Sequence, residues 1–167
     1  MGTVTIDAVN AMTVDEFTAS FGAVLEDSPH LAEAAAARRP FADTGAMAAA
    51  FADVVLSLRE DEAVVLLGAH PELGAKRPMA AASVAEQASA GLPGAEADLQ
   101  ARLAAGNAAY RERFGFPFIL AVRGRTPAEI VAVLEQRVGN DRTTELDTAL
   151  VQVCAIARLR IDQLVAS

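Results

Sequence analysis

The sequence of 167 residues predicts an all-α protein: a single compact bundle of about seven or eight helices that forms one domain. Three observations support this fold class. Helix start signals recur along the chain, alanine is abundant, and only residues 116–122 resemble a strand. That run contains Pro117 and has no second run to pair with, so we expect an extended connector there and no sheet.

Local signals predict three helices in the first third of the chain. Thr13 and Glu16 have the spacing of a capping box, and Gly22 follows as a stop signal. Ser28 precedes Pro29 as an N-cap, and that helix should reach the break at residues 38–40. The third helix follows from an apolar stripe formed by Met47, Phe51, Val54, Val55 and Leu58.

Five further helices are expected in the rest of the chain. Asp61 could cap a short helix that ends at Gly68. Ser83 and Glu86 repeat the capping-box spacing in a helix that ends near Gly91. The last three should lie between residues 99 and 115, 126 and 139, and 146 and 164, where caps, glycine stops and apolar stripes coincide.

Composition excludes several classes of function. The net charge is −8 and the basic residues form no stripe, so we expect no nucleic-acid partner. No apolar run approaches the roughly 18 residues of a membrane span, and no signal-peptide pattern is present, so we expect a cytoplasmic protein without a membrane partner. The single cysteine, Cys154, is expected to be a buried structural thiol. The abundance of alanine suggests a GC-rich bacterial genome.

His70 is the best candidate for a proton carrier. It follows an apolar run and lies between Gly68 and Gly74, next to Pro71, which predicts an unusual turn at a helix end. A histidine there could simply bond the last carbonyls of the helix, or it could transfer protons at neutral pH. The other histidine, His30, is expected to be exposed in a first helical turn. The two histidines are 40 residues apart and leave no metal ligand set.

Two further segments allow both a structural and a functional interpretation. Ser83 and Glu86 could only cap a helix, or they could face an anion at its N-terminus together with Gln87. Residues 114–118 form an aromatic cluster typical of a core, but the buried amides that follow would need partners, which a ligand rich in oxygen could supply.

Arg160 alternates with apolar residues, and an arginine near the core needs a paired anion. No Walker loop or dinucleotide fingerprint is present.

A series of short motifs covers nearly the whole chain: Phe21-Gly22, Arg39-Pro40-Phe41, His70-Pro71-Glu72-Leu73, Ser83-Val84-Ala85-Glu86-Gln87, Asn107 with Tyr110, Phe114-Gly115-Phe116-Pro117-Phe118 and Leu159-Arg160-Ile161. In order and spacing they resemble the family of 2-oxo-4-hydroxy-4-carboxy-5-ureidoimidazoline (OHCU) decarboxylases of urate degradation. The resemblance implies an all-α homodimer that converts OHCU into (S)-allantoin and CO2, the last step from urate to allantoin, with no cofactor and no metal.

The resemblance also implies roles for individual residues. His70 and Glu86 would be catalytic: His70 would handle a proton, and Glu86 would position the ring nitrogens and the ureido group. Arg160 would support the anionic substrate or orient Glu86. The substrate-binding residues would be Pro71, Ser83, Val84, Ala85, Glu86, Gln87, Phe118, Ile119, Leu120, Ala121, Val122 and Arg160.

Two alternatives remain open from the sequence. One is a non-catalytic helical module that a partner protein recognises, in which His70, Glu86 and Arg160 would lie apart. The other is a different cofactor-free lyase or isomerase that acts on a related ureide. Either enzyme predicts that the three side chains converge in one concave pocket.

Overall fold

The computed structural model describes residues 2–76 and 78–166, and Met1, Arg77 and Ser167 lie outside the described residues. Across the described part, the chain forms nine α-helices, two short 3-10 helices and one pair of two-residue strands, which confirms the all-α class. The chain divides into two compact units, residues 1–69 with 153–167 and residues 70–152. In the described ranges, no helix is both long enough and apolar enough to span a membrane.

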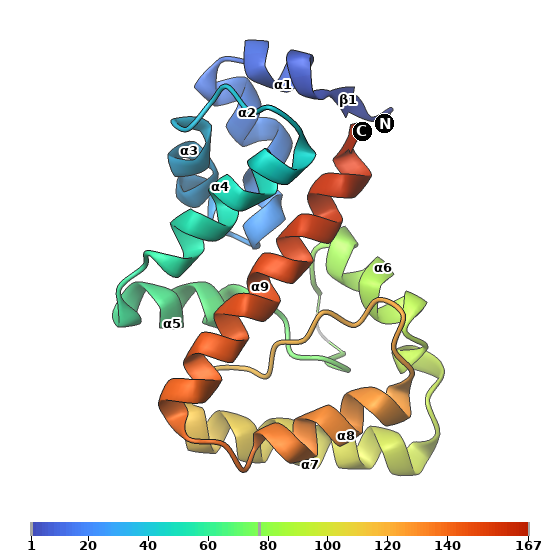
Figure 1. The fold of residues 1–167 in the computed structure, drawn as a ribbon. Helices are drawn as coiled ribbons and strands as arrows, with labels where there is room; N and C mark the ends of the chain where they lie inside the picture. The colour runs from blue at the N-terminus through green and yellow to red at the C-terminus, as the bar shows by residue number, and fades with distance from the viewer. Residues whose placement is uncertain (1, 77, 167) are drawn as a thin grey trace. The chain divides into compact units, whose positions relative to one another are not determined.

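Unit 1 consists of the N-terminal helices and the end of the last helix (Figure 1). The two strands pair in parallel, Val4 with Val165 and Thr5 with Ala166. The elements of the unit are β1 (Val4–Thr5), α1 (Ile6–Ala11), α2 (Val14–Phe21), η1 (Gly22–Leu25), α3 (Pro29–Ala36), α4 (Thr44–Leu56), α5 (Glu60–Ala69), the end of α9 (Arg142–Leu164) and β2 (Val165–Ala166).

The core of unit 1 is an aromatic cluster. The rings of Phe17 and Phe21 lie one turn apart on α2 with their centroids 4.8 Å from each other, and both side chains are buried. Phe41 and Phe51 complete the cluster at 6.2 and 6.1 Å from Phe17. The predicted capping box of α2 is confirmed, because Thr13 accepts from the Glu16 amide and Glu16 accepts from the Thr13 amide.

Unit 2 contains α6 (Ala81–Ser89), η2 (Leu92–Gly94), α7 (Ala97–Phe114), α8 (Pro127–Arg137) and the beginning of α9. The helix predicted up to Gly115 is confirmed: α7 ends there, at a glycine with φ +82°. The capping box at Thr126 and Glu129 is also confirmed at the start of α8. A second aromatic cluster, Tyr110, Phe114, Phe116 and Phe118, forms the core of this unit.

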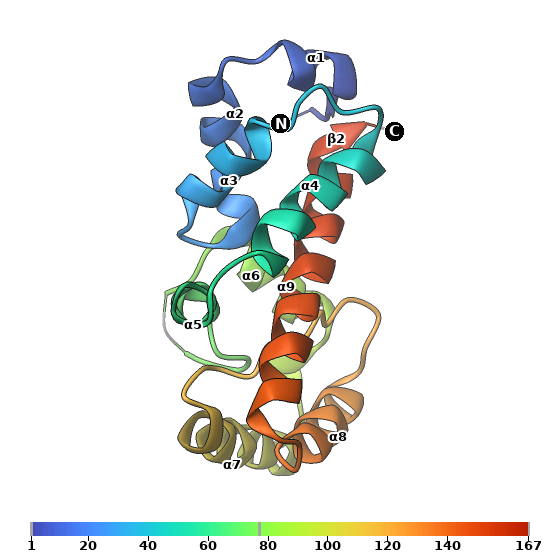
Figure 2. The same ribbon diagram turned by 60° about the vertical axis from the view of Figure 1, so that its left-hand side comes forward.

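Helices α7 and α8 pack side by side and run in the same direction (Figure 1; Figure 2). Contacts run from Arg102 of α7 with Glu135 of α8 to Arg113, near the end of α7, with the carbonyl of Asn140, just beyond the end of α8. Since parallel neighbours cannot be joined by a short loop, the chain must run back along the pair before α8 begins. Residues 116–122 make this return, with no strand pairing, as predicted.

Several predicted helix ends differ from the structure. Ser28 precedes α3, but its side chain makes no capping bond, and the helix ends at Ala36. Asp61 is not a cap, because α5 begins one residue earlier, at Glu60, and continues through Gly68. The short helix α1 lacks a strong sequence signal and was not predicted.

Cys154, which was predicted to be buried, is half-buried in the structure. Its partial burial raises the pKa of its thiol.

Candidate active site

His70 lies immediately after α5 and is the first residue of unit 2. Its side chain is buried, with 4% of its surface exposed, whereas His30 is exposed, as predicted. Pro71 and Glu72 are half-buried, and the Glu72 carboxylate lies 3.6 Å from Nε of Arg111. Of the two histidines, His70 is thus the one in a protected environment, where a side chain has a fixed geometry.

The helix that carries Ser83 and Glu86 begins earlier than predicted. Helix α6 starts at Ala81 after Ala80, whose side chain makes no capping bond. Ser83 is therefore in the first turn and Glu86 in the second, so the predicted capping box is wrong. The local spacing was correct, but the backbone already turns helical two residues before Ser83, where an N-cap serine would have to lie outside the helix. The interpretation of this pair as a helix cap is therefore wrong.

One face of α6 is buried. Ser83 and Gln87, four residues apart, are buried, and Glu86 beside them is half-buried. Val84 and Ala85 lie on the opposite, exposed face. Of the five residues predicted to meet the substrate here, three share the inward side of the helix and two do not.

Gln87 is bonded to the loop that follows His70. Its Oε1 accepts from the amide of Gly74 at 2.9 Å, and its Nε2 donates to Sδ of Met79 at 3.4 Å. The structure therefore brings two of the predicted site segments together, the His70 loop and the buried face of α6. The second bond is the weaker one, because a thioether is a poor acceptor.

The extended segment predicted to hold the substrate is buried in unit 2. Phe118, Ile119, Leu120 and Val122 are buried and Ala121 is half-buried. Side chains form hydrogen bonds with two of its backbone groups. The amide of Ala121 donates to Oε1 of Gln152 at 3.0 Å, and the carbonyl of Ile119 accepts from Nη1 of Arg137 at 2.8 Å. These two groups have protein partners, where the sequence alone suggested a ligand.

A buried ion pair supports this segment. Nη2 of Arg137 lies 2.9 Å from the carboxylate of Glu145, and the two side chains are 7% and 0% exposed. The guanidinium carbon of Arg137 also lies 4.7 Å from the ring centroid of Phe118. Asn140 and Tyr110 both donate to Glu145, so the buried carboxylate is well solvated by protein groups.

Burial shifts the ionisation of the tyrosine in this network. Tyr110 is fully buried and donates its hydroxyl to Glu145. Burial and this hydrogen bond raise the pKa of Tyr110 well above its usual value, and the nearby charge of Arg137 only partly opposes the rise. The phenol is therefore a permanent donor at neutral pH.

Arg160 lies in unit 1, on the last turns of α9, and is 4% exposed. Its Nη2 is 2.8 Å from Oε1 of Glu26, and its Nη1 donates to the carbonyls of Ala23 and Val24. Glu26 thus supplies the anion that the sequence required for a buried Arg160. The predicted role of Arg160 toward Glu86 stays a prediction. Glu26 itself has φ +39°, a region that non-glycine residues avoid and that often marks a functional position. By contrast, Arg158 is exposed and paired with Asp162.

Sequence reasoning assigned no role to three buried polar groups of these networks. Of Glu26, Glu145 and Asn107, only Asn107 occurs in the motifs quoted above, and Glu26 and Asn107 bond groups that are 134 and 34 positions away. Arg137 carried a detectable signal, because it follows Ile130 and Leu134 on the apolar face of α8. A charged residue at a core position predicts a buried partner.

Comparison with known proteins identifies the family of this chain. A sequence model described as OHCU decarboxylase matches residues 10–162. A 2-oxo-4-hydroxy-4-carboxy-5-ureidoimidazoline decarboxylase of Haloferax volcanii is 40% identical over 161 residues, which cover 96% of this chain and 96% of that protein.

Two solved structures are similar in fold. A crystal structure of (S)-allantoin synthase matches with a TM-score of 0.81 and 28% identity, over 98% of this chain and 54% of that one, so this chain spans about half its length. A crystal structure of OHCU decarboxylase in the presence of (S)-allantoin matches with a TM-score of 0.71 and 26% identity, over 84% of this chain and 94% of that one. The chain therefore belongs to the OHCU decarboxylase family.

Proposed function

We infer that this protein decarboxylates OHCU to (S)-allantoin and CO2, the last step of urate conversion to allantoin. The observation that carries this inference is the family match along residues 10–162, which includes the buried His70 and the inward face of α6. The names of the similar proteins, among them an OHCU decarboxylase studied with (S)-allantoin, point to the same reaction.

The substrate supplies its own electron sink. Its C4 carries both the carboxylate and the hydroxyl, next to a C=N bond. When the bond from C4 to the carboxylate carbon breaks, the electron pair moves toward that C=N bond and its nitrogen takes up a proton. The hydroxyl proton then leaves as C4 becomes a carbonyl, and C5 receives a proton on one face. One proton is consumed overall, and no cofactor has to accept electrons.

We assign the proton steps to His70 and the orientation of the substrate to Glu86. A histidine can accept the hydroxyl proton and return one near neutral pH, and a buried side chain holds that proton at one face. The Glu86 carboxylate can accept from the ring N–H groups and from the ureido group. The stereochemistry of the product depends on this geometry, because the uncatalysed reaction has no preferred face.

The proposal for the remaining predicted residues follows from their surroundings. Ser83 and Gln87 share the buried face of α6, and residues 118–122 of the same unit offer backbone groups. Arg160 would favour an anionic substrate in a protein whose net charge is −8. Val84 and Ala85, which are exposed, could contribute only through their backbone.

The test uses freshly generated substrate. OHCU is produced in the cuvette from urate by the two preceding enzymes, and circular dichroism follows the formation of (S)-allantoin. We expect rapid formation of one enantiomer with this protein and a slow, racemic reaction without it. A chain that leaves the rate and the enantiomeric ratio at their uncatalysed values would refute the proposed function and favour a non-catalytic helical module.

Three finer points are also proposals. A bacterial source is supported by the abundance of alanine, and a cytoplasmic location by the single cysteine, which is typical of a reducing compartment. A homodimer is implied by the resemblance to the family. Size-exclusion chromatography with light scattering would test the last point, with a monomer as the result that contradicts it.

A further inference from the structure

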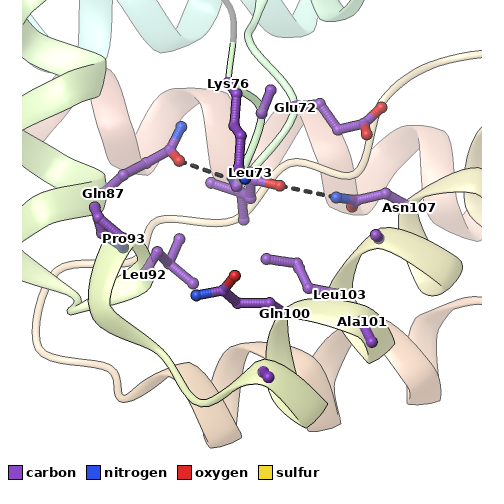
Figure 3. A pocket seen from close by; sticks show the side chains of 14 residues that line it. Glu72, Leu73, Lys76, Gln87, Leu92, Pro93, Gln100, Ala101, Leu103 and Asn107 are labelled. Carbon is purple, nitrogen blue, oxygen red and sulfur yellow. Dashed lines mark hydrogen bonds between the residues drawn. The ribbon is translucent and has the colours of Figure 1, made fainter.

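A single peptide group in the loop after His70 is held at both ends by side-chain amides. The carbonyl of Leu73 accepts from Nδ2 of Asn107 at 2.8 Å, and the amide of Gly74 donates to Oε1 of Gln87 at 2.9 Å (Figure 3). Asn107 comes from α7 and Gln87 from α6, so side chains of two helices form hydrogen bonds with one peptide group. The contact borders a cavity of about 570 Å³ in unit 2.

This arrangement limits how the loop can move. The C=O and the N–H of a trans peptide point in opposite directions, so two partners on opposite sides resist both rotation and translation of the peptide plane. Gly74 adopts φ +76°, and a Cβ built on it would lie 2.8 Å from Cδ2 of Leu103. The loop therefore has little room beside α7, and the held peptide begins only three residues after His70.

Stability alone does not explain an asparagine at position 107. The side chain is 2% exposed, on a helix face that also buries Leu103 and Tyr110. Its Oδ1 is buried with no hydrogen-bond partner among the described residues, which costs free energy. Asn107 thus gains one hydrogen bond, to the Leu73 carbonyl, and leaves its own Oδ1 unsatisfied. The advantage of this residue must therefore lie in the position of the loop that the bond fixes.

We propose that Asn107 is a positioning residue for His70, acting through the Leu73 carbonyl. With Gln87 on the other side, it fixes the loop from which the imidazole projects. A proton carrier must be held within about 0.5 Å of its productive position, and a shift of about 1 Å can cost about 10²-fold in rate. The kinetic consequence rests on the proposed function, whereas the structural consequence does not.

The experiment compares Asn107→Leu with the wild type by NMR and by kinetics. His70 and His30 are the only histidines, so the imidazole Cε1–H signals can be assigned with His30→Gln. We expect the His70 signal to shift or broaden in Asn107→Leu and the His30 signal to stay in place. We also expect kcat to fall about 10- to 100-fold with a much smaller change in KM, and a lower enantiomeric excess of (S)-allantoin.

Asn10→Leu is the matched control. Asn10 also holds backbone, donating to the Phe41 carbonyl and accepting from the Phe41 amide, both at 2.8 Å, but in unit 1. This variant should melt at a lower temperature and keep the His70 signal, kcat and enantiomeric excess of the wild type. Asn107→Ser, whose hydroxyl can reach the Leu73 carbonyl through one water, should give intermediate values, and it replaces Asn107→Leu if that variant does not fold.

The outcomes separate the two proposals. An unchanged His70 signal and unchanged kcat in folded Asn107→Leu or Asn107→Ser would overturn the positioning role. Equal effects of Asn107→Leu and Asn10→Leu on kcat would do the same, because they would reflect stability only. If the wild type does not decarboxylate OHCU, the proposed function fails, and the NMR comparison still decides whether Asn107 positions His70.

Discussion

Arg160 and Glu26 lie 134 positions apart in the sequence, and their side chains meet at 2.8 Å inside unit 1, where each is no more than 5% exposed. Two carbonyls of the same turn, those of Ala23 and Val24, also accept from the guanidinium. Removing one member of such a pair leaves the other charge buried without compensation. The pair is therefore part of the structure of the unit as well as a candidate for the site.

Arg160→Gln should destabilise unit 1 strongly, by about 3–5 kcal/mol, because the Glu26 carboxylate would stay buried without its cation. Turnover of OHCU should fall strongly as well. Arg158→Gln removes an exposed pair with Asp162 and should change stability by less than about 1 kcal/mol, with little effect on turnover. Urea denaturation and initial rates measure both effects. Small, equal effects of the two substitutions would contradict both the structural role of the buried pair and a role of Arg160 in turnover.

His70→Asn should abolish stereoselective decarboxylation and leave the helical fold intact. The substitution removes the proton carrier, a loss of about 10²- to 10⁴-fold, and asparagine still fills most of the space. The rate of (S)-allantoin formation and the far-ultraviolet circular dichroism give the two readouts. His30→Gln is the control, since His30 is exposed. An unchanged rate in His70→Asn would remove His70 from the mechanism.

Glu86→Gln should reduce activity far more than stability. Glu86 is not the third residue of α6, so its carboxylate does not complete a capping box, and the change in stability should be well under about 1 kcal/mol. Glu16→Gln, which alters a real capping box in α2, is the comparison. Full activity of Glu86→Gln with unchanged melting would leave the carboxylate without a role in the reaction.

Tyr110 should titrate far above the usual range of a phenol. It is the only tyrosine and the chain has no tryptophan, so absorbance at 295 nm reports on it alone. Because the pKa of Tyr110 is raised in the folded protein, the unfolded chain loses this proton first, at about pH 10. Its contribution to stability is therefore complete below about pH 10 and is lost as the pH rises further. A native phenol that titrates near pH 10 would contradict the buried network.

Activity should persist after exhaustive chelation and dialysis. The electron sink lies in the substrate, and the sequence offers no ligand set for a metal. Initial rates before and after treatment with EDTA, with the final buffer treated with a chelating resin, provide the measurement. A loss of rate that a divalent ion restores would contradict a metal-independent reaction.

Local signals explain what could be predicted from the sequence. The capping boxes at Thr13 and Thr126 depend on side chains three positions apart, so a short stretch of sequence predicted correctly where α2 and α8 begin. Ser83 shows the limit of this reasoning, since the same spacing occurs inside α6. A capping pattern is informative only when the preceding residues are not already helical.

Contacts between different elements account for what could not be predicted. The buried pair of Arg137 and Glu145 and the bond of Asn107 to Leu73 depend on which segments the fold brings together, and no periodic pattern encodes that. The sequence did indicate that Arg160 needs an anion, but Glu26 was no better a candidate than other acids. Burial of a charge is predictable from its apolar neighbours, whereas the identity of its partner requires the fold.

Unit 1 is built from two separate stretches of the sequence, and this has a consequence for protein synthesis. Residues 70–152 form unit 2 as one uninterrupted stretch, but unit 1 needs residues 153–167 as well as residues 1–69. A ribosome therefore adds every residue of unit 2 to the chain before it adds Arg160 or β2. The first 69 residues are therefore made long before the arginine of α9 that pairs with the Glu26 carboxylate. A chain stopped at residue 152 should thus leave its N-terminal helices exposed to chaperones and proteases.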